Sequence, residues 1–121
     1  MNLFDASALL AFLLEEEGSA VVEEKLHEGG VCGAANWAEV AQKVRSSGRD
    51  WVLARALLAS YGLRIEPVTV EDAELAAALW TRGSGHSLGD RLCLALARRL
   101  EATVWTADSR WGSDGPIEQI R

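Results

Sequence analysis

Short strand-like runs recur along the chain and are separated by much longer segments. Runs of this kind, bounded by glycine or polar residues and carrying β-branched or aromatic side chains, predict strands buried in a sheet. They lie at residues 2–4, 31–32, 64–68, 103–106 and, in the IEQI tail, 117–120. Because none of these runs is long, the strands of the sheet are expected to be short.

The segments between the strands carry apolar residues every three or four positions, the spacing of helices that bury one face. The clearest example follows Ser87, where Leu88, Leu92, Leu96 and Leu100 are spaced four residues apart and predict one buried stripe. Five other helices are predicted. The first ends at about Glu16, the second runs from Ser19 through Leu26, and the third contains Trp37 and Val44 and ends before Gly48. The fourth runs from Asp50 to before Gly62, and the fifth runs from Thr69 through Leu79.

This alternation of strands and helices is typical of a three-layer α/β/α domain with a short, mostly parallel central sheet. With 121 residues, the chain is long enough for one such domain over residues 1–121, with a core that needs neither disulfides nor a structural metal. Ligands of parallel sheets bind beyond the carboxyl ends of the strands. Asp5 and Asp108 follow predicted strands, and Glu39 and Asp90 are expected in the first turns of helices.

Taken one at a time, these acids are explained by helix capping. Asp5 and Asp108 suit the N-cap position, where a carboxylate accepts hydrogen bonds from free backbone N–H groups. The capping-box spacing, in which the acid at the third helical position bonds back to the cap, occurs at Asn36–Glu39, Ser87–Asp90 and Thr69–Asp72. No chemistry is expected at the last of these pairs, so the spacing alone does not identify a functional site.

Taken together, the four acids indicate a metal centre. Carboxylates gathered in one cleft repel one another unless a cation neutralises them. A set of oxygen ligands without His or Cys selects Mg²⁺ or Mn²⁺ over zinc. An ion held in this way keeps open positions for water and phosphate oxygens, which suits hydrolysis of phosphodiester bonds. The predicted ligands are Asp5, Glu39, Asp90 and Asp108.

The segments that contain these acids resemble the four acidic motifs of the PIN-domain ribonucleases. They are NLFDASALL, NWAEV, SLGDRLCLALA and VWTADSRW, and they are most similar to VapC-type toxins of bacterial toxin–antitoxin pairs. The resemblance covers essentially the whole chain and implies a PIN-like fold and an Mg²⁺- or Mn²⁺-dependent endoribonuclease. It implies that the four acids bind the catalytic metal and that the RNA products carry a 5′-phosphate and a 3′-hydroxyl.

The resemblance has further implications for neighbouring residues and partners. Thr106 matches a hydroxyl residue that supports the metal ligands or their water, and Ser7 and Asn36 match polar positions around them. The family also implies a homodimer and a cognate antitoxin whose C-terminal segment occupies the active-site groove. That segment is expected to offer a basic side chain to the acids and apolar side chains to an exposed helical face.

The charge of the chain is unfavourable for RNA at first sight. The net charge is −6, but residues 1–42 hold eight acids against Lys25 alone, whereas residues 43–121 hold eleven bases against ten acids. Neutralising the four acids with metal leaves −2. Candidate RNA contacts are Arg91, Lys43 and Arg45, although Lys43 fits equally well as a helical partner of Glu39. His86 is either a proton donor or a polar loop residue.

The cysteines and the lack of a targeting segment indicate where the protein works, and two other functions compete with the nuclease. Cys32 and Cys93 have apolar neighbours, which predicts reduced core thiols and a cytoplasmic protein, and neither a signal peptide nor a membrane segment is recognised. The alternative function is a catalytically silent PIN-fold module that binds RNA or protein. A phospho-accepting receiver domain is disfavoured, since Asp5 has no acidic neighbour and no lysine accompanies a late strand.

Overall fold

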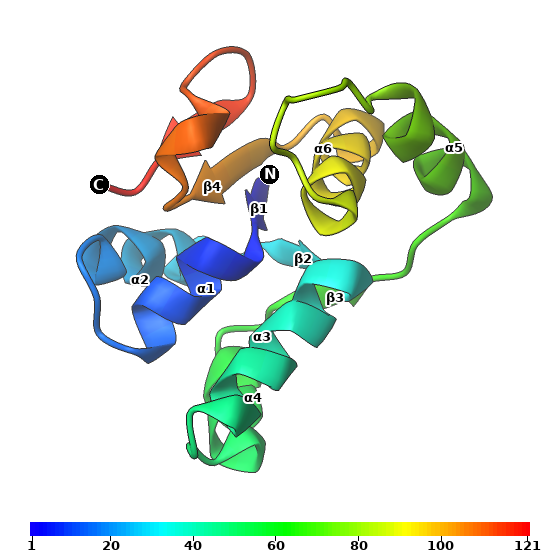
Figure 1. The fold of residues 1–121 in the computed structure, drawn as a ribbon. Helices are drawn as coiled ribbons and strands as arrows, with labels where there is room; N and C mark the ends of the chain where they lie inside the picture. The colour runs from blue at the N-terminus through cyan, green and yellow to red at the C-terminus, as the bar shows by residue number, and fades with distance from the viewer.

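The computed structural model describes residues 1–121 as one five-stranded sheet with helices on both sides (Figure 1). All neighbouring strands are parallel, and their order is β3-β2-β1-β4-β5. The strands are β1 (Asn2–Phe4), β2 (Val31–Gly33), β3 (Arg64–Glu66), β4 (Thr103–Thr106) and β5 (Ile117–Gln119). The predicted three-layer α/β architecture with a short parallel sheet is confirmed.

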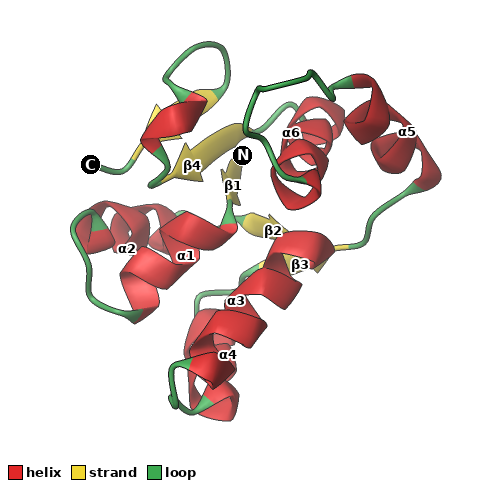
Figure 2. Ribbon diagram, viewed as in Figure 1, coloured by secondary structure: helices red, strands yellow, loops and turns green.

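Helices make up most of the regular structure, and the strands between them are short (Figure 2). They are α1 (Ala6–Leu13), α2 (Ser19–His27), α3 (Ala34–Ser46), α4 (Trp51–Ser60), α5 (Val70–Ala78), α6 (Leu88–Leu100) and the 3₁₀-helix η1 (Ser109–Trp111). Figure 1 shows α1 and α2 on one side of the strands and α5 and α6 on the other. No helix combines the length and the apolar character that crossing a bilayer requires.

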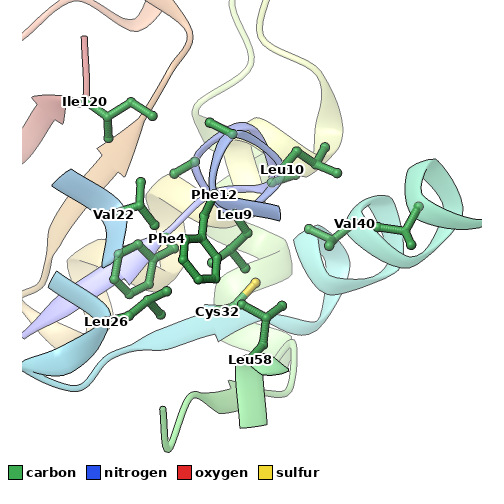
Figure 3. Packing of buried hydrophobic residues seen from close by; sticks show 14 residues of the cluster. Phe4, Leu9, Leu10, Phe12, Val22, Leu26, Cys32, Val40, Leu58 and Ile120 are labelled. Atoms are coloured by element: carbon green, nitrogen blue, oxygen red, sulfur yellow. The ribbon is translucent and has the colours of Figure 1, made fainter. Parts of the chain in front are cut away.

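Two apolar clusters, one on each face of the sheet, hold the layers together. Each receives a side chain from β1, because successive side chains of a strand point to opposite faces. Phe4 packs into the larger cluster with residues of α1 to α4 such as Leu9, Leu26 and Leu58 (Figure 3). Leu3 packs into the smaller cluster with residues of α6 and β4. Both side chains are fully buried, so β1 is fixed at the centre of the domain.

The order of the strands places a topological switch beside β1. From β1 the chain proceeds to β2 and β3 on one side, and after α5 and α6 it returns as β4 on the other side. Crevices at such switch points, outside the carboxyl ends of the strands, are where open α/β sheets bind ligands. Asp5 directly follows β1 and Asp108 comes shortly after β4, so both lie at this crevice.

Two helix predictions need correction. The first helix ends at Leu13 rather than near Glu16, because the backbone turns into left-handed conformations at Glu15 and Gly18. A side chain at Gly18 would meet Ile120, so this turn packs directly against the C-terminal strand region. The predicted leucine stripe of α6 is also shifted: Leu88 is exposed, whereas Cys93, Leu96 and Ala97 are buried.

Candidate active site

Asp5 is the buried centre of a hydrogen-bonding network at the end of β1. Its Oδ1 accepts the backbone N–H of Ala8 at 2.8 Å, so Asp5 does cap α1. The Ser7 hydroxyl reaches Oδ1 at 2.7 Å and Oδ2 at 2.9 Å, and the Thr106 hydroxyl donates to Oδ2 at 2.6 Å. With 4% of its surface exposed, Asp5 is far more enclosed than a surface helix cap requires.

The electrostatic state of Asp5 reflects this enclosure. Burial raises the pKa of Asp5 from 3.8 to about 6, against the hydrogen bonds from Thr106, Ala8 and Ser7, which lower it. The nearby Asp90 carboxylate raises the pKa further. The surroundings of Asp5 therefore disfavour its negative charge, which a bound cation would offset.

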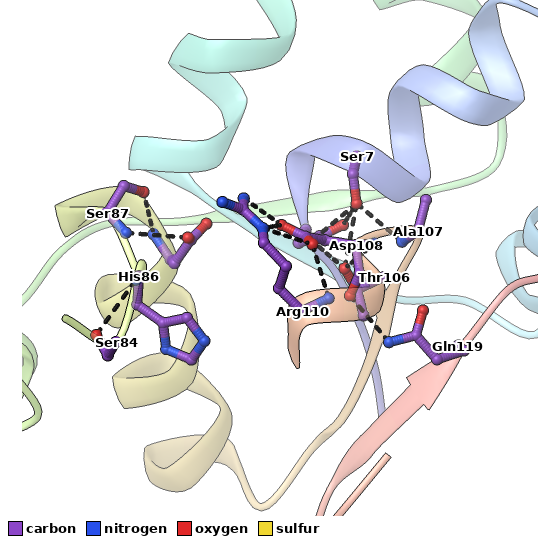
Figure 4. Close-up of polar contacts among 11 residues, drawn as sticks. Ser7, Ser84, His86, Ser87, Thr106, Ala107, Asp108, Arg110 and Gln119 are labelled. Atoms are coloured by element: carbon purple, nitrogen blue, oxygen red, sulfur yellow. Dashed lines mark hydrogen bonds and ion pairs between the residues drawn. The ribbon is translucent and has the colours of Figure 1, made fainter. Parts of the chain in front are cut away.

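Thr106 and Ser7 couple the end of β4 to α1. Thr106 is completely buried. Its hydroxyl donates to Asp5, and its hydroxyl oxygen accepts the backbone N–H of Asp108 at 3.0 Å. The Ser7 hydroxyl oxygen accepts the backbone N–H of Ala107 at 2.9 Å and lies 3.2 Å from the Thr106 hydroxyl. Figure 4 shows these groups gathered where β4 ends. The network fixes the carboxylate of Asp5 relative to the backbone of Asp108.

Glu39 does not belong to a capping box, contrary to the sequence interpretation. Helix α3 begins at Ala34, with Gly33 as its cap, so Glu39 lies in the second turn of the helix. Instead, the Asn36 side chain donates to Glu39 Oε1 at 3.0 Å and to the carbonyl oxygen of Gly89 at 3.3 Å. Asn36 is buried and thus holds Glu39 close to the start of α6.

Asp90 is a true capping residue that retains one free oxygen. The backbone N–H of Ser87 donates to Asp90 Oδ2 at 3.0 Å, and the backbone N–H of Asp90 donates to the Ser87 hydroxyl at 3.1 Å. Thr69 and Asp72 form the same capping box at α5, where Asp72 also pairs with Arg99 at 2.9 Å. The difference is position, because Asp90 lines a cleft and Asp72 does not line it.

Asp108 follows β4 and pairs with a basic residue that sequence reasoning did not select. Its Oδ1 accepts the backbone N–H of Arg110 at 3.0 Å, as the cap of η1. The Arg110 guanidinium donates to Oδ1 at 3.0 Å and to Oδ2 at 2.6 Å. The Arg110 hydrogen bonds hold the pKa of Asp108 below its usual value. The D-x-R spacing within TADSRW was the available signal for this contact.

The four acids converge on one pocket of about 320 Å³. Only one of its lining residues, Ala6, is hydrophobic, and the wall comprises Asp5, Ala6, Ser7, Asn36, Glu39, Lys43, Gly85, Ser87, Asp90, Asp108 and Arg110. These residues come from segments far apart in the chain, so the tertiary structure creates the cluster. No three acidic, histidine or cysteine side chains stand in metal-ligating geometry, and Mg²⁺ ordinarily needs only one or two carboxylates, with waters in its other positions.

The other candidate residues are placed differently. Lys43 lines the pocket, whereas Arg45 is exposed and does not line it. The Arg91 guanidinium turns towards α5 and donates to the carbonyl oxygen of Ala76 at 2.8 Å, so the structure does not bring it into the pocket. The His86 ring packs against Trp111 with 5.7 Å between ring centroids, outside the pocket wall.

Comparison with known proteins places this pocket in a family. Residues 3–113 match the PIN domain, a span that contains all four acids. The chain belongs to the PIN-domain family. Within that family it is similar to a VapC ribonuclease of Mycobacterium bovis and to ribonuclease VapC42 of Mycobacterium tuberculosis. Each is 32% identical over 107 residues, covering 79% of this chain and 82% of the relative. The chain is thus a member of the VapC ribonuclease group, as its four motifs predicted.

Solved structures show the same fold for this PIN-domain chain. A protein from a toxin–antitoxin complex of Klebsiella pneumoniae superimposes with a TM-score of 0.80 at 17% identity, covering 100% of this chain and 98% of that one. VapC20 of M. tuberculosis, described as a toxin that cleaves the sarcin–ricin loop, superimposes with a TM-score of 0.69 at 16% identity over 88% of each chain. At these identities the likeness concerns the fold alone.

Proposed function

We propose that this chain is a divalent-metal-dependent endoribonuclease, the toxin of a toxin–antitoxin pair, that hydrolyses phosphodiester bonds in RNA. Membership of the VapC ribonuclease group supports the activity class. The observation that carries the proposal for this chain is the convergence of Asp5, Glu39, Asp90 and Asp108 on one polar pocket at the switch point of the sheet.

The donor set fits Mg²⁺ or Mn²⁺. All four candidate ligands offer hard carboxylate oxygens, and no His or Cys side chain lines the pocket. Asp5 is the strongest argument for a cation, since burial disfavours its ionised form in the absence of a positive partner. When bound, such an ion supplies a water that is nucleophilic at neutral pH and offsets charge on the phosphate.

The residues of the chain divide the remaining work. Ser7 and Thr106 hold the Asp5 carboxylate in one orientation, and Asn36 does the same for Glu39. Lys43, at the rim of the pocket, is placed to contact an RNA phosphate. In the reaction, water attacks phosphorus and the bond from phosphorus to the 3′-oxygen breaks. The products are a 5′-phosphate and a 3′-hydroxyl.

Cleavage of a panel of RNAs in Mg²⁺ or Mn²⁺ tests the proposal. Asp5→Asn and Asp90→Asn should abolish cutting without unfolding the protein, because asparagine is also a good N-cap at position 5 and its amide oxygen can still accept the Ser87 N–H at position 90. Asp50→Asn is the matched control, since Asp50 caps α4 through the N–H of Leu53 at 3.2 Å but lies outside the pocket. Equal cleavage by wild type and Asp90→Asn would refute the assignment.

Metal binding provides a readout that does not depend on finding the right RNA. Mn²⁺ at 100 times its Kd should stabilise the wild type by about 2.7 kcal/mol, because it binds only the native state. Asp5→Asn and Asp90→Asn should lose most of this gain. Mn²⁺ binding without cleavage of any RNA would favour the catalytically silent module instead.

A second, apolar groove supports an antitoxin partner. The cavity measures about 530 Å³ between α1, α3 and α4, and its apolar wall includes Leu13, Val44, Leu53 and Leu57. We propose that apolar side chains of the antitoxin fill it while a basic side chain meets the acids. If the neighbouring gene encodes a small DNA-binding protein, co-purification of the two proteins should be lost on Leu53→Asp and retained on Val52→Asp, since both residues are exposed but only Leu53 lines the groove.

A homodimer and a cytoplasmic location complete the proposal. Trp80, just after α5, and Leu88, at the start of α6, are 54% and 59% exposed and are suited to contact a second copy. Light scattering should give twice the mass of the chain, and a monomer would refute this part.

Cys32 and Cys93 are free and buried, which agrees with a reducing compartment.

A further inference from the structure

Arg110 places a positive charge inside the acidic pocket. It belongs to η1, two residues after Asp108, and its side chain is part of the pocket wall together with Asp90 and Ser87. In Figure 4 the Arg110 guanidinium reaches to the Asp108 carboxylate from the side of the pocket where Ser87 lies. The pocket therefore contains a cation that comes from the chain itself.

The pair uses much of the bonding capacity of Asp108. An ionised carboxylate offers about four acceptor positions. Asp108 Oδ1 receives both the backbone N–H and the Nε of Arg110 at 3.0 Å, and Oδ2 receives Nη2 at 2.6 Å and Nε at 3.2 Å, so all four positions are in use. Metal ligation through Asp108 must therefore displace at least part of the Arg110 guanidinium.

Arg110 is free to move when that happens. Its side chain is 67% exposed, and its only ion pair is with Asp108. A guanidinium released at this edge would lie among the carboxylates that gather the metal, where an RNA phosphate also has to bind. Arginine suits this second contact because its planar fork matches two phosphate oxygens.

We propose that Arg110 competes with the divalent ion for Asp108 and, once displaced, binds the RNA phosphate. This inference rests on the proposed nuclease function and adds to it a specific residue for substrate binding. Through this exchange, one arginine offsets part of the negative charge of the pocket before the metal binds and part of the negative charge of the phosphate afterwards. No proton or covalent bond changes in this step, because the guanidinium stays charged throughout.

Calorimetric titration with Mn²⁺ alone tests the competition. Arg110→Ala should bind Mn²⁺ several-fold more tightly than the wild type, and Arg110→Lys, which keeps the charge but loses the fork, should lie between them. Arg98→Ala is the control, because Arg98 is an exposed arginine on α6 that does not line the pocket. Mn²⁺ binding by Arg110→Ala that is unchanged or weaker overturns the competition.

Cleavage kinetics test the phosphate contact, with the RNA of the panel that the wild type cuts fastest. Despite its tighter metal binding, Arg110→Ala should show at least tenfold lower kcat/KM. Its slope of log(kcat/KM) against log[salt] should be smaller by about 0.7, the value for one phosphate contact on a single strand. An unchanged rate and slope overturn the contact.

Different results would refute the proposed nuclease function and the role of Arg110. If the wild type neither binds Mn²⁺ nor cuts RNA, the proposed function fails and this inference fails with it. If the wild type binds Mn²⁺ and cuts RNA while Arg110→Ala behaves like Arg98→Ala in both assays, only the role of Arg110 is refuted.

Discussion

Replacing Asp5 by Asn should make the protein more stable when divalent metal is removed. Burial raises the pKa of Asp5 from 3.8 to about 6, so keeping this carboxylate ionised costs folding free energy at neutral pH. At 1.36 kcal/mol for each pKa unit, a pKa raised from 3.8 to about 6 corresponds to about 3 kcal/mol. Asparagine carries no charge and avoids this cost, but its amide cannot accept every hydrogen bond that the carboxylate accepts. The expected gain is therefore about 1 to 3 kcal/mol.

The sign and the pH window follow from the direction of the shift. Because the folded-state pKa of Asp5 is raised, the stability that its protonated form contributes is present below about pH 4 and is lost as pH rises through about 6. Asp5→Asn should thus differ little from the wild type near pH 4. At pH 8 its melting temperature should be higher by roughly 4 to 12 °C.

Thermal or urea denaturation in EDTA at pH 4 and pH 8 measures this effect. Asp50→Asn makes the same substitution at another helix cap, but at an exposed position, and should change stability little at either pH. Adding Mn²⁺ at pH 8 should reverse the order, because only the wild type keeps the full set of carboxylates. A gain that is absent at pH 8, or equal at both pH values, would refute the electrostatic explanation.

Two further substitutions test packing at the site and an ion pair away from it. A Cβ atom at Gly89 would collide with Glu39 Oε1, so Gly89→Ala should displace this carboxylate and weaken Mn²⁺ binding several-fold in calorimetry. Stability in EDTA should be unchanged or improved by up to ~1 kcal/mol, since alanine favours helices, and a lower melting temperature there would contradict this. Arg99→Ala removes the partner of the buried Asp72 and should lower the melting temperature clearly more than Arg98→Ala, its exposed neighbour. Equal effects of these two variants would show that the ion pair contributes little.

Much of the fold could be predicted from the sequence because its determinants are local. Strand-like runs, helical spacing and caps such as Asp50 and Ser87 depend on residues a few positions apart, and they specified a parallel α/β domain. Boundaries were less certain where the tertiary structure intervened. The turn after α1 is set by packing of Gly18 against Ile120, about a hundred residues away in the chain.

For the candidate site, the sequence by itself determined that Asp5 and Asp108 follow strands and that Asp90 starts a helix, but it misplaced Glu39, which lies in the second turn of α3. It could not determine their surroundings, because desolvation and charge pairing depend on which distant segments fold together. Only the tertiary structure decided that Thr106 hydrogen-bonds Asp5, that Arg91 turns towards α5, and that Arg110 lines one pocket with the distant acids. Free energies of burial and of ion pairing arise from three-dimensional neighbours, so the chemistry of this pocket became visible only in the folded chain.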